Sequence, residues 1–87
     1  MSLGVITVEG DEYMEVEVRL FATFREGREK KQKIKIAENT SILDIINLLN
    51  IDEEEVAIML LNGRDGTSNR LLKDGDIISL FPPVGGG

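Results

Sequence analysis

One segment of this chain combines the length and the periodicity of an amphipathic helix, and segments with the period of β-strands lie on both sides of it. Thr40 or Ser41 is expected to start the helix, because a hydroxyl there caps free N–H groups, and Asp44 completes a sequence similar to a capping box. Asn50 is the expected stop. The apolar residues at helical spacing are Ile42, Ile45, Ile46 and Leu49. A single helix with one apolar face must bury that face on another layer, so we expect a sheet beneath it.

Two segments before the helix predict a β-hairpin. In residues 14–20, apolar side chains alternate with Glu15, Glu17 and Arg19, which is typical of a half-buried strand; its core positions are Val16, Val18 and Leu20. A polar loop over 24–30 follows, and then Ile34 and Ile36 alternate with Lys33 and Lys35. In such a pair Glu15 and Glu17 are expected to face Lys33 and Lys35, with a few tenths of a kcal/mol per contact.

After the helix the sequence predicts further strands. Residues 52–55 are interpreted as a solvated turn, and the near-continuous apolar run 56–61 as a central strand covered on both faces. Residues 64–72 are expected to be irregular, with room for one short strand, and 73–76 to form a tight turn. The closing strand is 77–81, because two prolines follow it and proline gives no N–H to a sheet.

This order of elements predicts an α+β fold of the β-grasp, or ubiquitin-like, type. We expect a mixed four- or five-stranded sheet with one main helix across one face, and a right-handed crossover that places a later strand parallel to the first. The predicted divisions are a flexible or edge-strand extension over 1–13, the β-grasp domain over 14–81 and an extended tail over 82–87.

Composition excludes several functions for this 87-residue chain. Without Cys or His it forms no disulfide, lacks the usual ligands of zinc and offers no nucleophile–base pair, so we predict no metal site. The net charge of −6 argues against nucleic acid as a partner. Basic residues do gather over 25–35, but only Phe24 lies close by as a candidate platform for stacking a base, so we interpret the stretch as a solvated surface or as a docking patch for an acidic partner. With no secretory signal and no membrane-length apolar run, we expect a cytoplasmic protein.

The chain ends in Gly85, Gly86 and Gly87. Because glycine lacks a Cβ, such a tail lets an enclosing enzyme approach the backbone closely and guides a terminal carboxylate into a narrow site. Residues 82–87 would reach about 20 Å at roughly 3.3 Å per residue. The alternative interpretation is a frayed terminus or a cloning scar.

Three stretches carry a family resemblance: residues 18–26, residues 61–64, and residues 72–76 leading through 77–80 into Phe81-Pro82-Pro83-Val84 and the glycines. Together they resemble the MoaD/ThiS group of sulfur carriers over residues 14–87. Within that group the ending is most similar to the small subunit of molybdopterin synthase and to the small archaeal modifier proteins. One departure is Gly85, since members of the molybdopterin type often have a small non-glycine residue there.

The resemblance implies a carrier without catalytic residues and without a bound cofactor. A ubiquitin-activating-type enzyme would use ATP to adenylate Gly87, and a sulfur donor would convert it to a thiocarboxylate. The implied acceptor is the large subunit of molybdopterin synthase, with thiamin thiazole or tRNA thiolation as related destinations. The alternatives are a protein modifier joined to lysines through Gly87 and a non-covalent β-grasp module with an inert tail.

The candidate docking residues are Phe21, Phe81, Pro82 and Pro83. Phe21 leaves the alternation of its strand. Phe81 is expected on the opposite face of its strand from Ile78 and Leu80. Both rings are therefore candidates for an open face or edge of the sheet. The alternative is that either ring completes the core. Acidic residues around such a patch would suit basic grooves on the partners.

Overall fold

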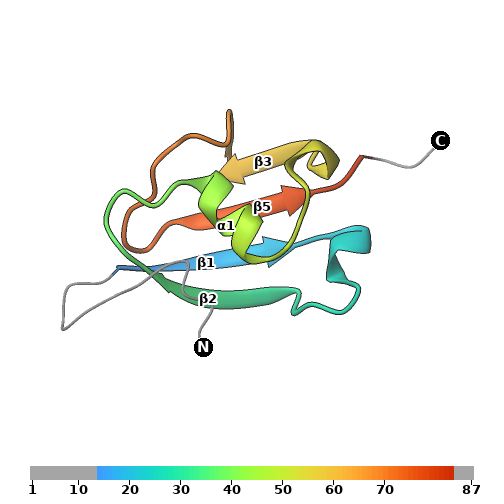
Figure 1. Ribbon diagram of the computed structural model, residues 1–87, viewed down its shortest axis with the longest axis horizontal. Coiled ribbons are helices and arrows are strands. Elements are labelled where there is room, and N and C mark those ends of the chain that lie inside the picture. Colours follow the sequence, from blue (N-terminus) through green and yellow to red (C-terminus); the bar gives the residue numbers. More distant parts are fainter. Residues whose placement is uncertain (1–13, 84–87) are drawn as a thin grey trace.

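The computed structural model describes residues 14–83, and the predicted elements are present (Figure 1). The predictions for residues 1–13 and 84–87 lie outside this range. The elements, in chain order, are β1 (Met14–Leu20), the 3₁₀ helix η1 (Ala22–Arg25), β2 (Lys31–Ile36), α1 (Ile42–Leu48), the 3₁₀ helix η2 (Glu53–Glu55), β3 (Ile58–Leu61), β4 (Arg64–Asp65) and β5 (Ile77–Phe81).

The five strands form one mixed sheet in the order β2-β1-β5-β3-β4, and α1 crosses one face of it (Figure 1). Strand β5 is parallel to β1 and antiparallel to β3, while β1 and β2 are antiparallel. The predicted β-grasp architecture is thus confirmed. The hairpin has the expected register, with Glu15 opposite Lys35 and Glu17 opposite Lys33.

The core lies between α1 and the sheet, as the alternation predicts. Its buried apolar residues are Val16, Val18, Leu20, Phe24, Ile36, Ile42, Ile45, Ile46, Ile51, Val56, Met59, Leu72, Ile78 and Leu80, with Leu49 packed against them as a partly buried neighbour. Phe24 is therefore a core residue, so the aromatic ring nearest to the basic stretch is not available to stack on a nucleic-acid base. Its place in η1 turns the ring inward beneath the loop.

The prediction for the apolar run 56–61 is wrong in two respects. The central strand is β5, not β3, and β3 is covered on one face only. Met59 is buried beneath α1, whereas Ile58 is 42% exposed. The reason is that residues 14–83 supply one helix layer, and no element among them covers the second face of the sheet.

Helix α1 has the predicted capping box. The Asp44 backbone N–H donates to Ser41 Oγ at 3.2 Å, and the Ser41 backbone N–H donates to Asp44 Oδ2 at 2.9 Å. At the other end Asn50 adopts a left-handed φ of 60°, and Arg28 donates to the carbonyl oxygens of Leu49 and Asn50, each at 3.2 Å. These donors satisfy carbonyl groups that the helix leaves unpaired.

The segment after α1 is exposed, as the prediction of a solvated turn requires. It forms the short helix η2, which Asp52 caps and which is linked to the 64–72 loop by a hydrogen bond from Ser68 to Glu53. Residues 14–83 contain no helix that combines the length and the apolar character needed to span a membrane.

Candidate functional site

The described part of the candidate site is the root of the glycine tail. Gly85, Gly86 and Gly87 lie outside the described residues, so their role stays a prediction. Phe81 ends β5, which is hydrogen-bonded to strands on both sides, and the Ala57 N–H donates to the Phe81 carbonyl oxygen at 2.8 Å. Pro82 and Pro83 follow, with Pro83 exposed. The tail is thus attached to the central strand of the sheet, which is paired on both sides.

Phe21 and Phe81 form a stacked aromatic pair at this root. Their ring centroids are 4.3 Å apart and their planes differ by 9°. Both rings are partly exposed, while Ile78 and Leu80 on the alternate positions of β5 are fully buried. Of the two interpretations left open by the sequence, the open-face position is therefore the one observed, since neither ring belongs to the buried core.

The strand register explains how Phe21 reaches Phe81. Phe21 is extended and continues the parity of Glu17 and Arg19, so its ring lies on the open face, and the pairing of Leu20 with Leu80 brings the next residues, Phe21 and Phe81, side by side. Ala22 then adopts a left-handed φ of 57°, where η1 begins. A left-handed alanine costs about 1–2 kcal/mol, so the rest of the fold must hold this bend in place.

Arg25 completes the aromatic surface. Its guanidinium carbon lies 5.2 Å from the centroid of the Phe21 ring, within the range of a cation–π contact. Its Nε also donates to the Leu20 carbonyl oxygen at 2.8 Å, which fixes the side chain against the end of β1. This contact is not among the predictions made from the sequence. The spacing of four residues between Phe21 and Arg25, about one helical turn, was the available signal.

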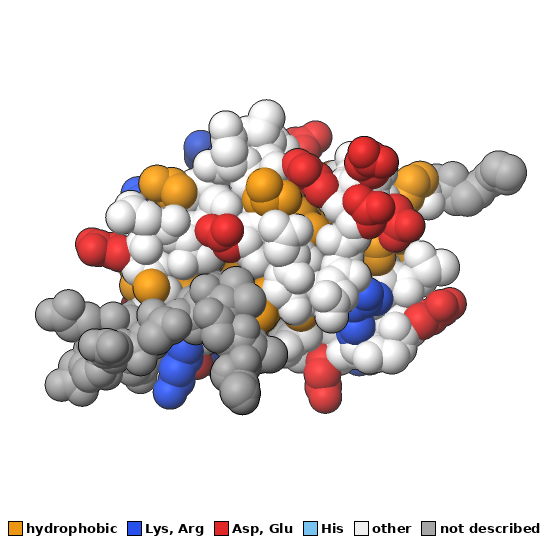
Figure 2. All heavy atoms as spheres, viewed as in Figure 1, with side chains coloured by type: hydrophobic (Ala, Val, Ile, Leu, Met, Phe, Trp, Pro, Cys, Tyr) orange, Lys and Arg blue, Asp and Glu red, His pale blue; other side chains and the backbone are white. Residues whose placement is uncertain are grey.

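A groove of about 370 Å³ lies next to the aromatic pair. It is lined by Phe21 and four basic residues: Arg19, Arg25, Lys30 and Lys31. The expectation of an acidic surround is therefore wrong on this side of the pair. Acidic side chains gather instead over η2, where Figure 2 shows them on the face that carries α1. The reason is the hairpin register, which places Arg19 directly opposite Lys31 on the open face.

Glu17 is the carboxylate next to this groove, and it is paired. Arg19 Nε donates to Glu17 Oε2 at 2.5 Å. That hydrogen bond lowers the pKa of Glu17 below its usual value against a smaller desolvation effect, and the charges of Arg19, Lys31 and Lys33 lower it further. Glu17 is thus ionised at neutral pH and offsets part of the charge of Arg19.

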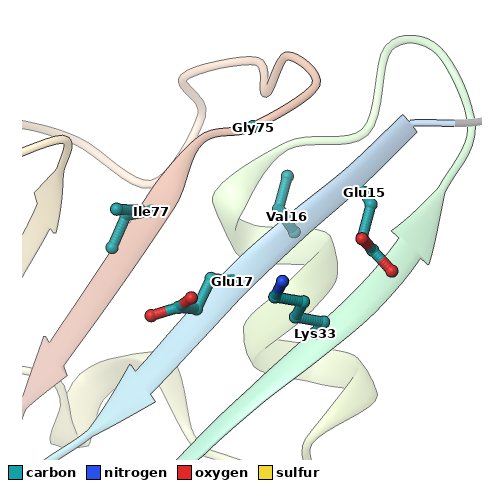
Figure 3. Close-up of a pocket in the computed structure, with 6 residues that line it drawn as sticks. All are labelled: Glu15, Val16, Glu17, Lys33, Gly75 and Ile77. Carbon is teal, nitrogen blue, oxygen red and sulfur yellow. The ribbon is translucent and has the colours of Figure 1, made fainter.

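A second, smaller hollow of about 170 Å³ lies farther along the same open face. Figure 3 looks onto the sheet with α1 behind it and shows Glu17 and Lys33 on neighbouring strands, with Glu15 and Ile77 at the edges. Its charges are of both signs and it has no nucleophile paired with a base. Within residues 14–83 no three acidic side chains come together as a metal site.

Comparison with known proteins gives the family. The model of the ThiS family matches residues 18–87. The chain belongs to the ThiS family. A curated relative, small archaeal modifier protein 3 of Haloferax volcanii, is 33% identical over 85% of this chain and 100% of its own length.

Two solved structures are also similar to this chain. One is described as molybdopterin converting factor subunit 1 from Pyrococcus furiosus; it has a TM-score of 0.67 and 30% identity over 82% of this chain and 99% of its own. The other is a complex of subunits 1 and 2 of the molybdopterin-converting factor from Helicobacter pylori; it matches with a TM-score of 0.53 and 35% identity over 85% of this chain and 100% of its own. These findings confirm the MoaD/ThiS resemblance and place the chain among ubiquitin-like sulfur carriers and modifiers.

Proposed function

We propose that this ThiS-family chain is a sulfur carrier whose terminal Gly87 is adenylated and then converted to a thiocarboxylate. The observation that supports this most is the root of the tail: the central strand β5 leads through Pro82 and Pro83 toward the glycines, beside an exposed aromatic pair. A scaffold of this kind holds a reactive end away from its own surface. The chemistry is then supplied by the enzymes that enclose the tail.

The proposed reaction activates a poor electrophile. A free carboxylate resists attack, whereas an acyl-adenylate made from ATP by a ubiquitin-activating-type enzyme has AMP as a good leaving group. Sulfur from a donor then displaces AMP and leaves a thiocarboxylate. In this scheme ATP belongs to the activating enzyme, and the chain supplies only Gly87 and a docking surface.

In this proposal the sulfur acceptor is the large subunit of molybdopterin synthase, in the cytoplasm. The similarity to a converting factor that was solved as a complex of its two subunits supports this partner. Phe21 and Phe81, with Pro82 and Pro83 beyond them, would form the contact, because partly exposed aromatic rings are frequent anchors of protein interfaces. Thiamin thiazole and tRNA thiolation remain the related destinations.

A second candidate is a protein modifier that is joined to lysines through Gly87. The observation that favours it is the similarity to small archaeal modifier protein 3. Both functions share the adenylation step and differ in the nucleophile that attacks the adenylate: a sulfur donor in one case, a lysine amine in the other.

Intact mass spectrometry separates these functions. The full chain is incubated with its cognate activating enzyme, ATP and a sulfur source. Replacement of one oxygen by sulfur supports the carrier, and lysine-linked adducts support the modifier. A chain without Gly86 and Gly87 is the control: it should remain unmodified, with thermal unfolding almost unchanged. If the full chain shows no ATP-dependent change, both functions are refuted and the inert-tail module gains support.

A further inference from the structure

The groove beside the aromatic pair reverses the charge of the molecule locally. The chain has a net charge of −6, yet the groove brings together Arg19, Arg25, Lys30 and Lys31. Of these, Arg19 is paired with Glu17 and Arg25 lies over the Phe21 ring. Lys30 and Lys31 are exposed and form no ion pair within residues 14–83.

The hairpin register makes this arrangement costly for the isolated fold. Arg19 and Lys31 are directly opposite each other on neighbouring strands. Like charges directly opposite each other destabilise a sheet. Farther along the same hairpin, opposite charges face each other, at Glu17 with Lys33 and at Glu15 with Lys35. The repulsive pair therefore lies at the end of the hairpin that adjoins the aromatic stack.

The groove and the aromatic pair are one continuous surface, because the Phe21 ring belongs to both. A protein that covers the stacked rings also covers the rim of the groove and removes its cations from water. Burying cations without partners is strongly unfavourable, whereas pairing each one with a carboxylate offsets the cost. A partner that docks on the rings must therefore bring negative charge to this rim.

We propose that the groove binds an acidic segment of the protein that docks on the aromatic pair, with partner carboxylates facing Lys30 and Lys31. This rests on the proposed function, since it assumes a partner at the root of the tail. A nucleic-acid strand fits less well. Phe21, the aromatic residue of the groove, is stacked on Phe81 and contacted by Arg25, so its faces are occupied.

An NMR titration of the full ¹⁵N-labelled chain tests the groove without any sulfur chemistry. The probe is hexaglutamate, capped at both ends, in about 50 mM NaCl, where exposed charges are weakly screened. We expect saturable shifts of the backbone amides of Arg19, Phe21, Lys30 and Lys31. Binding should weaken at least fivefold in about 500 mM NaCl, because screening by salt is then much stronger.

Two double variants with the same change in net charge give the control. Lys30→Glu/Lys31→Glu should abolish the shifts, while Arg64→Glu/Lys73→Glu, at exposed sites outside the groove, should retain them. The spectrum of each free variant shows whether it is folded.

The proposal is overturned if hexaglutamate leaves these amides unmoved, if its binding survives Lys30→Glu/Lys31→Glu, or if sodium sulfate or single-stranded oligothymidine produces the same saturable shifts at equal charge. Sulfur loading of the wild-type chain without peptide binding would refute the groove alone. Peptide binding without sulfur loading would refute the proposed function alone.

Discussion

Leu80 and Phe81 are neighbours on β5 with side chains on opposite faces of the sheet, so their alanine variants should separate folding from docking. Leu80 is fully buried, and truncating a buried leucine costs about 2–5 kcal/mol through lost apolar transfer and the cavity left behind. Phe81 is partly exposed and stacked on Phe21. Its truncation removes a stack worth about 0.5–1.5 kcal/mol and only part of a buried side chain's area, so we expect a loss of about 2 kcal/mol or less.

The effect on docking should follow the opposite order. As an aromatic anchor at an interface, Phe81 should contribute at least about 1.4 kcal/mol to binding, which is a tenfold change. We therefore expect Phe81→Ala to lower the kcat/KM of ATP-dependent sulfur loading, or the affinity for the large subunit, at least tenfold. Leu80→Ala, measured at a temperature where it is still folded, should load at nearly the normal rate.

The assays are urea unfolding for stability and intact mass against time for loading. In a domain of this size 1 kcal/mol corresponds to about 4–8 °C in Tm, so Leu80→Ala should unfold roughly 10 °C or more below the wild type. Leu71→Ala is the matched control, because Leu71 is a 55% exposed apolar residue that lies beside Ser41, away from the aromatic pair. The reasoning fails if Phe81→Ala destabilises the fold as much as Leu80→Ala does, while the activating enzyme and the large subunit both bind Phe81→Ala normally.

Three further predictions concern the scaffold. Ile46→Ala should cost about 2–5 kcal/mol in urea unfolding, because Ile46 is a fully buried residue of α1; a loss below about 1 kcal/mol would contradict that burial. Ser41→Ala should cost about 1 kcal/mol by removing an oxygen that accepts from the Asp44 N–H, and an unchanged midpoint would argue against the capping box. Arg19→Gln should raise the pKa of Glu17, measured by NMR of its carboxyl carbon, because the hydrogen bond from Arg19 is the main cause of the lowered pKa. Because folding lowers the pKa of Glu17, this pair stabilises the fold at pH values above the pKa that Glu17 has in the unfolded chain. The stabilisation is lost as the pH falls through the pKa of Glu17 in the folded chain. An unchanged pKa of Glu17 in Arg19→Gln would refute this.

Much of the fold could be predicted because local periodicity encoded it. The alternation in β1 and the capped apolar face of α1 each follow from neighbouring residues, and the crossover rule then gives the parallel pairing of β1 with β5. The prediction for residues 56–61 was wrong because an apolar stretch does not reveal how many of its faces are covered by other layers. Only the number of helices decides that, and the chain has one α-helix in the part the structure describes.

The candidate site was predictable in part. The parity of Phe81 could be read from β5, but its stack on Phe21 joins residues 60 positions apart and depends on the parallel register that pairs Leu20 with Leu80. The sequence of one strand alone does not give its register with a strand so far along the chain. The basic groove could be predicted more easily, because the register that pairs Glu17 with Lys33 also places Arg19 opposite Lys31. The groove becomes apparent only when the basic residues over 25–35 are considered together with the neighbouring strand β1.

The central claim is that the reactive group of this protein is the carboxyl end of its chain, which other proteins load. Fragmentation of the sulfur-loaded chain in a mass spectrometer tests it most directly, since it locates the sulfur along the sequence. The account predicts sulfur on the carboxyl group of Gly87, appearing only with ATP and the activating enzyme. Sulfur found on any other residue, or incorporated equally well by a chain that ends at Val84, would contradict it.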